Sequence, residues 1–67
     1  MEFELQTEFI ELYKLLKILN VSESGGQAKL FIDEGEVMLN GSLEKRRRAK
    51  IRKGDVINIF DLEILVK

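Results

Sequence analysis

The chain has 67 residues, and a domain of this size buries only about 60% of the surface that its unfolded form exposes. It contains no cysteine and no histidine, which excludes disulfides, thiolate zinc sites and catalysis by a thiol or an imidazole. The net charge is −1, from eleven basic and twelve acidic residues, but the basic residues are not spread evenly.

The N-terminal part predicts a short strand followed by an amphipathic helix. Phe3 and Leu5 alternate with polar residues, which is the pattern of a half-buried strand. Thr7 is placed to cap a helix, and Glu8 and Glu11 then lie near its positive end. Over residues 8–19 the apolar side chains fall in one stripe roughly 160° wide. The stripe contains Phe9, Leu12, Tyr13, Leu15, Leu16 and Leu19.

A second, shorter helix is predicted between Ser24 and Gly35. Ser24 and Gln27 have the spacing of a capping box, in which two side chains satisfy the free backbone donors of a helix start. Gly25 and Gly26 cost helix propensity there, so close backbone access or tight packing is expected at this point. Gly35 is predicted to end the helix in a left-handed conformation. The apolar face consists of Ala28, Phe31 and Ile32.

The remaining residues predict strands and tight turns. Val37 and Leu39 alternate with polar or flexible neighbours and lead into Asn40-Gly41, a strong hairpin signal because both residues tolerate positive φ. The returning strand is expected to run through the basic residues as far as Arg52. After a turn at 53–55, strands are predicted over 56–60 and 62–66, with a reversal at Asp61. The predicted order is β-α-α-β-β-β-β, an α+β fold.

Seven of the eleven basic residues fall within positions 44–53, which we call the basic segment. They are Lys45, Arg46, Arg47, Arg48, Lys50, Arg52 and Lys53, and Glu44 is the one acid among them. The segment carries a charge of +6, and the rest of the chain carries −7. Because clustered Lys and Arg displace counterions from a phosphate backbone, this distribution favours a localised polyanion site, with RNA or DNA as the partner.

Not all seven cations can face the same groove if the basic segment is extended. Neighbouring side chains of an extended chain point to opposite faces, so alternate positions share a face. Arg46, Arg48, Lys50 and Arg52 have this parity and are expected to form the better-aligned row. Arg47 and Lys53 are weaker candidates.

A pattern of fixed positions resembles a known family. It comprises Ser24, Ala28, Lys29, Ile32, Gly35, Val37 and Leu39-Asn40-Gly41, followed by Gly54-Asp55 before an apolar strand. Over residues 8 to about 60 the chain closely resembles the RNA-binding domain named after the fourth protein of the small ribosomal subunit, the S4 domain. Residues 22–29 and 45–48 look most like the small stand-alone bacterial members, which are thought to act on or near the ribosome.

The resemblance implies a fold and an activity. The fold is the αL motif, in which two packed helices lie against a small, strongly bent, mostly antiparallel sheet, here as a single domain over residues 1–67. The activity is binding of structured RNA, including ribosomal RNA. Lys29 matches the family's basic residue after the alanine, so the resemblance assigns it an RNA contact. Many members carry arginine directly after the serine, where this chain has Gly25.

The candidate RNA-binding residues fall in two groups, each with a second interpretation. The helix start at Ser24 could cradle a phosphate with free N–H groups, or could be only a capped helix packed closely on its neighbour. The basic segment could hold phosphates through guanidinium forks, or could be a solvated edge that prevents strand-to-strand aggregation. The full set is Ser24, Gly26, Gln27, Lys29, Lys45, Arg46, Arg47, Arg48, Lys50 and Arg52.

The aromatic residues are predicted to belong mostly to the core. Phe3, Phe9, Phe31 and Phe60 lie at positions with core parity. Tyr13 lies at the edge of the first helix's stripe, where it could pack against the core or stack on a base.

These observations predict a non-catalytic protein that binds structured RNA, with ribosomal RNA and a role in ribosome assembly or quality control as the leading hypothesis. The alternative is a regulatory module whose basic strand docks an acidic protein, and DNA is a weaker third choice because no recognition-helix pattern is present. No metal, cofactor or small-molecule substrate is expected. The acidic, alternating N-terminus and the absence of a long apolar run predict a cytoplasmic protein without a membrane span.

Overall fold

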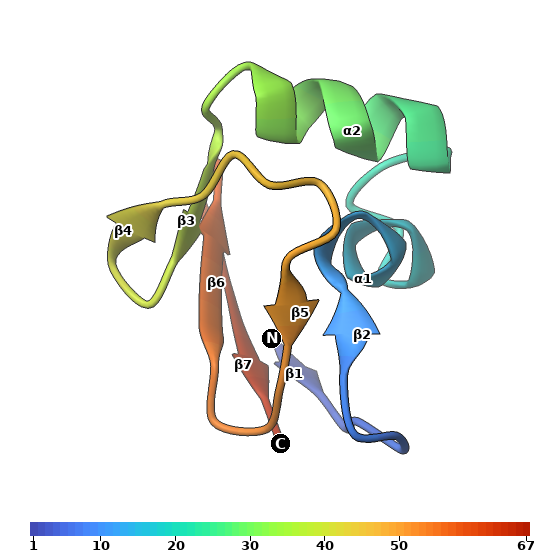
Figure 1. Cartoon of the computed structure of the whole chain (residues 1–67), viewed down its shortest axis with the longest axis vertical. Coiled ribbons are helices and arrows are strands. Elements are labelled where there is room, and N and C mark those ends of the chain that lie inside the picture. The colour runs from blue at the N-terminus through green and yellow to red at the C-terminus, as the bar shows by residue number, and fades with distance from the viewer.

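The computed structural model describes all 67 residues, which form two short helices and seven short strands (Figure 1). In chain order these are β1 (Glu2–Phe3), β2 (Ile10–Glu11), α1 (Leu12–Ile18), α2 (Gly25–Asp33), β3 (Val37–Leu39), β4 (Ser42–Leu43), β5 (Lys50–Ile51), β6 (Val56–Ile59) and β7 (Leu62–Val66). Neither helix has the length and apolar character that a membrane crossing requires.

Five strands form one sheet in the order β1-β7-β6-β3-β4. β1 runs parallel to β7, and the other neighbours are antiparallel. In the central strand β6, Ile57 lies opposite Leu39 of β3 and Ile64 of β7. The other two strands, β2 and β5, form a separate antiparallel pair that joins the basic segment to the start of α1.

The core lies between the two helices and the inner face of the larger sheet. Both helices contribute the faces that their apolar spacing predicts, with fully buried side chains at Leu12, Leu15, Leu16, Ala28 and Ile32. The strands contribute alternate positions, as expected for a sheet with one buried face, and these are Val37, Ile57, Ile59, Ile64 and Val66. The predicted α+β architecture of two helices packed against a mostly antiparallel sheet is confirmed.

The local signals for the two ends of α2 and for the β3–β4 turn are confirmed. Ser24 caps α2, because its hydroxyl oxygen accepts a hydrogen bond from the backbone N–H of Gln27 at 3.1 Å. Gly35 follows the end of α2 with φ of +80°, and Asn40 and Gly41 form the β3–β4 turn with φ of +50° and +84°. These positive φ angles are those that glycine and asparagine adopt at least cost.

The predicted start of the first helix is wrong. α1 begins at Leu12, and no acidic residue lies in its first turn. The Thr7 hydroxyl donates to the carbonyl of Phe9 at 2.8 Å and so closes a local turn rather than capping a helix. Residues 10–11 are extended because they pair with β5, with Ile10 opposite Ile51. The pairing of β2 with β5 takes the place of the first helical turn that local propensity favours.

The predicted return strand after the hairpin is also wrong in its length. β4 ends at Leu43, and residues 44–49 contain no strand. The chain turns there, with the N–H of Ala49 donating to the carbonyl of Arg46 at 3.2 Å. It then enters β5, which belongs to the other strand pair. The element order therefore has one more strand before α1 and one more after α2 than predicted.

Candidate nucleic-acid interface

Main-chain hydrogen bonds hold the basic segment against the start of α1. The N–H of Leu12 donates to the carbonyl of Ala49 at 2.9 Å, and the N–H of Tyr13 donates to the carbonyl of Arg47 at 3.1 Å. These bonds satisfy donors that a helix leaves unpaired at its N-terminus. Ala49 is only 3% exposed, so its methyl group anchors the segment in the core. The backbone that carries the basic side chains is therefore fixed by α1.

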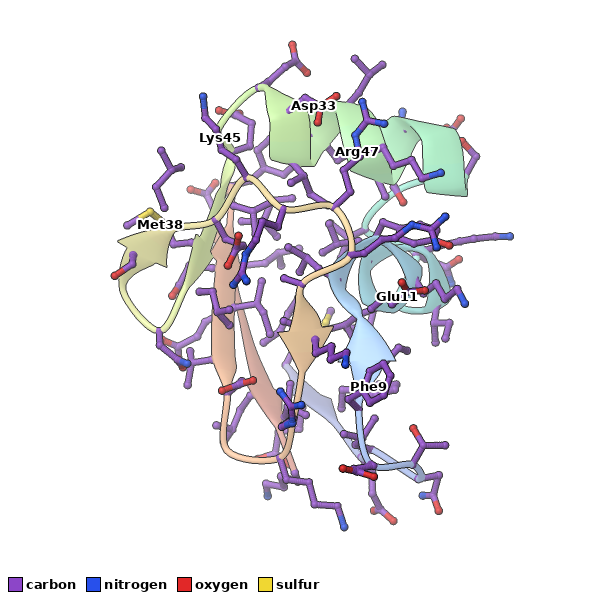
Figure 2. All side chains as sticks on the ribbon, in the orientation of Figure 1. Phe9, Glu11, Asp33, Met38, Lys45 and Arg47 are labelled. Atoms are coloured by element: carbon purple, nitrogen blue, oxygen red, sulfur yellow. The ribbon has the colours of Figure 1, made fainter.

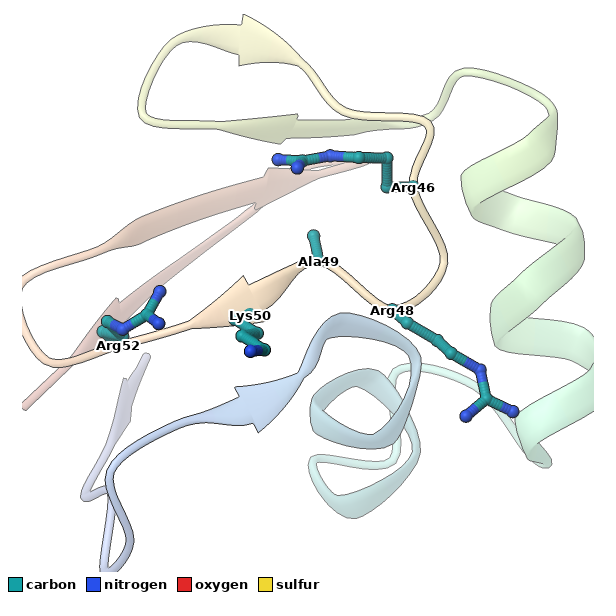
Figure 3. Close-up of a pocket in the computed structure, with 5 residues that line it drawn as sticks. All are labelled: Arg46, Arg48, Ala49, Lys50 and Arg52. Carbon is teal, nitrogen blue, oxygen red and sulfur yellow. The ribbon is translucent and has the colours of Figure 1, made fainter.

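Four cations of the basic segment surround one open hollow of about 380 Å³ (Figure 3). The lining residues are Arg46, Arg48, Ala49, Lys50 and Arg52. We call this feature the basic hollow. Its cations are those that alternate along the chain, as the parity argument predicts, although the segment reaches this arrangement through a turn rather than along a continuous strand.

Arg46 is held by a carboxylate of the same chain. Its Nε and Nη2 atoms donate to the two carboxylate oxygens of Glu44, each at 3.0 Å, and its backbone N–H donates to the same group at 2.9 Å. These hydrogen bonds lower the pKa of the Glu44 carboxyl below its ordinary value, and the same pair raises the pKa of Arg46. The charge of Arg46 is therefore largely balanced within the protein.

Arg47 and Lys45 lie away from the basic hollow, near the end of α2 (Figure 2). The guanidinium of Arg47 forms a two-pronged ion pair with Asp33, with Nε donating to Oδ1 at 2.9 Å. This hydrogen bonding, together with the nearby charge of Lys45, lowers the pKa of Asp33. Of the predicted site residues, Arg47 and Lys45 are those of the basic segment that the structure does not bring to the hollow.

The other three cations of the hollow are more available to a ligand than Arg46 is. Lys50 and Arg52 have no carboxylate within ion-pair distance. Nη1 of Arg48 is 3.6 Å from one carboxylate oxygen of Glu11. The other oxygen of Glu11 is 3.2 Å from Nζ of Lys14. The Arg48 side chain is 69% exposed. Glu11 thus balances part of the charge of Lys14 and Arg48, and the remaining positive charge of this surface faces solvent.

Lys29 of α2 and Arg48 of the basic segment meet over the ring of Tyr13. The Lys29 Nζ atom is 4.7 Å and the Arg48 Cζ atom 5.7 Å from the ring centroid, and Lys14 is 5.9 Å away. Contacts of this kind are favourable because the face of an aromatic ring is negative. The structure therefore places the lysine of the second helix next to Arg48 of the basic segment.

The polar side chains at the start of α2 are engaged in capping. Ser24 accepts from the Gln27 N–H, and the side-chain oxygen of Gln27 accepts from the Glu23 N–H at 2.6 Å. Gly26 borders open space, with only the Ser24 hydroxyl oxygen near the position of a Cβ, and Gly25 lies beside the Tyr13 ring. Ser24 and Gln27 are thus cap residues, which leaves the N–H groups of the first turn as the groups that could meet an anion.

The assignment of all four phenylalanines to the core is wrong for two of them. Phe9 is 37% exposed and Phe60 is 55% exposed, whereas Phe3 and Phe31 are partly buried against the core. Phe60 has φ of +54° in the β6–β7 turn and packs edge-on against Phe31. Phe9 lies before β2, and the centroid of its ring is 4.9 Å from Nζ of Lys50. Its helical spacing is misleading because the residue is not in a helix.

The carboxylates that hold Arg46 and Arg47 give stability a defined pH dependence. A lowered folded-state pKa stabilises the protein above the ordinary pKa of the carboxyl, which is 4.5 for Glu44, and this contribution is lost as pH falls through the folded-state pKa. Glu44→Gln is therefore expected to reduce stability at neutral pH, and its stability should approach that of the wild type as pH falls below 4.5. Urea unfolding at a series of pH values measures this difference. A difference in the free energy of unfolding that is the same at neutral and acidic pH would contradict this prediction.

Comparison with known proteins gives one family and several relatives. A family model described as S4 domain matches residues 3–67. A Bacillus subtilis protein described as probable ribosome maturation protein RlbA is 44% identical over 55 residues, which is 82% of this chain and 78% of the relative. An Escherichia coli protein described as putative RNA-binding protein YbcJ is 47% identical over 49 residues, which is 73% of this chain and 70% of the relative.

A solved structure shares the fold. The solution structure of YbcJ from Escherichia coli, described as having an αL motif involved in RNA-binding, superposes with a TM-score of 0.74 at 39% sequence identity. The match covers 97% of this chain and 84% of that one. The two helices and the bent sheet of the present structure are therefore those of the αL motif.

Proposed function

The chain belongs to the S4 domain family, and from this we propose that it binds structured RNA through the basic hollow together with Lys29. One observation carries this proposal. Lys50, Arg52 and Lys29 have no carboxylate partner, although the rest of the chain is net negative. Arg48 connects them, because it lines the hollow and also contacts Tyr13 beside Lys29.

The chemistry of these groups suits the phosphate backbone. Arginine and lysine side chains donate hydrogen bonds and accept none, and a guanidinium can hold a phosphate through two parallel hydrogen bonds. The major groove of A-form RNA is too narrow for side chains to read bases, so duplex RNA is recognised by shape and backbone contacts. The protein recognises the spacing of phosphates on a folded RNA rather than the base sequence of a duplex.

The partner we infer is ribosomal RNA, and the role is in the maturation of the ribosome. The relative in Bacillus subtilis is described as a probable ribosome maturation protein, and that of Escherichia coli as a putative RNA-binding protein. The role is binding rather than catalysis, since the chain has no histidine or cysteine and its carboxylates at the basic surface are occupied by arginine and lysine. A ribosomal partner places this work in the cytoplasm.

Salt dependence tests the proposal. If Lys29, Arg48, Lys50 and Arg52 each neutralise one phosphate, the logarithm of the binding constant should fall with the logarithm of salt concentration with a slope of roughly −3 to −3.5. Filter binding to ribosomal RNA at several salt concentrations measures this slope. A slope near zero would contradict binding through phosphates.

An acidic polypeptide serves as the second ligand in the same assay. Binding to polyglutamate with no binding to ribosomal RNA would favour the alternative of a module that docks an acidic protein. The RNA proposal predicts that the protein binds ribosomal RNA and that polyglutamate, added at the same concentration of negative charges, does not displace the RNA.

A further inference from the structure

Three open hollows adjoin one another through shared lysines. The basic hollow shares Lys50 with a second hollow of about 400 Å³, and this second hollow is lined by Phe9, Ile10, Glu11, Lys14 and Lys50. Lys14 also lines a third hollow of about 400 Å³ beside Tyr13 and Gly25. The shared lysines place the three hollows in a row from the basic segment, past β2, to the start of α2.

Phe9 is the aromatic ring of the second hollow, and it projects from the chain before β2 rather than into the core (Figure 2). Its ring centroid is 4.9 Å from Lys50 Nζ and 6.0 Å from Arg52 Cζ. A single exposed aromatic residue is ordinary on a protein surface. An exposed ring set among cations that line adjoining hollows is the combination used to bind unpaired nucleotides, with the ring stacking on a base and the cations holding phosphates.

The groups around Phe9 leave it able to accept a base. A cation–π contact at an exposed site is weaker than the stacking of a base on an aromatic ring, so the Lys50 ammonium can leave the ring and bind the phosphate of an arriving nucleotide. Glu11 is the one carboxylate that lines this hollow. It is shared by Lys14 at 3.2 Å and Arg48 at 3.6 Å, so these two cations and one carboxylate together keep a net positive charge that can still attract a phosphate.

We propose that the second hollow binds an unpaired nucleotide, with its base stacked on Phe9 and its flanking phosphates on Lys50 and Lys14. This inference rests on the proposed RNA-binding function and makes it more specific. The basic hollow holds phosphates of a paired region, and the second hollow beside it holds the unpaired strand that leaves that region. The RNA class recognised is therefore a junction between duplex and unpaired nucleotides, rather than uniform duplex.

The test compares two RNAs of the same duplex sequence, one blunt-ended and one with short unpaired extensions at both ends of the duplex. The wild type is expected to bind the extended RNA more tightly. Phe9→Leu keeps an apolar side chain but cannot stack, and it is expected to weaken binding of the extended RNA by about tenfold, the size of one lost base–aromatic stack. Binding of the blunt duplex should change by less than about twofold. Phe60→Leu is the matched control because Phe60 is also exposed but lines none of the hollows.

A second variant reports stacking directly. The chain contains no tryptophan, so Phe9→Trp introduces a single fluorophore at the proposed site. This variant is expected to retain the preference for the extended RNA, and its emission should be quenched by the extended RNA but not by the blunt duplex. Circular dichroism of each variant establishes that the fold is kept.

The outcomes separate this inference from the function on which it rests. If the wild type binds both RNAs equally, if Phe9→Leu weakens both to the same extent, or if the tryptophan emission does not respond to the extended RNA, the stacking site is wrong while RNA binding stands. If the wild type binds neither RNA, both the stacking site and the proposed function are wrong.

Discussion

Replacing Arg48, Lys50 and Arg52 together by glutamine is expected to weaken binding to ribosomal RNA by roughly two to three orders of magnitude at moderate salt. Each cation that neutralises a phosphate releases condensed counterions, which is worth on the order of tenfold in affinity near 0.1 M salt. The salt slope should become shallower by about 2 to 3 at the same time. Equilibrium binding at several salt concentrations measures both effects.

The design of this variant follows from the contacts of the basic hollow. Glutamate at position 48 or 50 would place a new carboxylate beside Glu11, because Arg48 lies 3.6 Å from Glu11 and Lys50 is its partner across the β2–β5 pair. Like charges opposite each other on neighbouring strands are destabilising, whereas glutamine removes the charge alone. Lys67→Gln is the control, since Lys67 lines none of the hollows. Affinity within about threefold of wild type in the triple variant would show that the basic hollow is not the binding surface.

The largest expected effect on stability comes from Ile57→Ala. Ile57 is fully buried in the central strand β6 and is paired on both sides, with Leu39 and with Ile64. Truncating a buried isoleucine costs about 2–5 kcal/mol through lost burial and the cavity that remains. The whole 67-residue domain is expected to be stable by only about 3–10 kcal/mol. The unfolding midpoint should therefore fall by roughly 10–40 °C.

A substitution on the opposite face of the same sheet provides the comparison. Leu65 of β7 is 37% exposed, and Leu65→Ala removes a side chain of similar size without opening a buried cavity. Its free energy of unfolding should fall by less than about 1 kcal/mol. Thermal melts of the two variants followed by circular dichroism make the comparison. Equal losses for both substitutions would contradict the location of the core on the inner face of the sheet.

Features that depend on neighbouring residues in the chain could be predicted from the sequence. The capping serine, the left-handed Gly35 and the Asn40-Gly41 turn each follow from the backbone geometry that those residue types favour. The buried faces of both helices follow from apolar spacing, because that spacing is a property of a helix once its limits are known. The S4 domain and its αL motif followed from the same positions taken together.

Features that depend on distant partners could not be predicted. Residues 8–11 have the spacing of a first helical turn, but the pairing of Ile10 with Ile51 makes residues 10 and 11 extended. Helical spacing therefore predicts a core position for Phe9, whereas the residue lies on the surface. The sequence alone does not reveal the ring that we place at the centre of the nucleotide site.

The division of the basic segment into free and balanced cations was likewise beyond the sequence. Arg46 and Arg48 are equivalent by composition and by parity, yet Arg46 is held by both oxygens of Glu44. Arg47 finds Asp33 only because α2 ends beside the loop that carries it (Figure 2). Which arginine is free depends on how the loop at 44–49 folds and on where the carboxylates of Glu44 and Asp33 then lie, and that information is carried by the tertiary structure alone.

Crosslinking of the protein to RNA in living cells, followed by sequencing of the attached RNA, tests the central claim most directly. The experiment compares the wild type with the triple glutamine variant at positions 48, 50 and 52, expressed at the same level. The account predicts crosslinks concentrated at discrete positions of ribosomal RNA for the wild type and their loss in the variant. The same crosslinked positions in both proteins, or reads spread in proportion to RNA abundance in both, would contradict it.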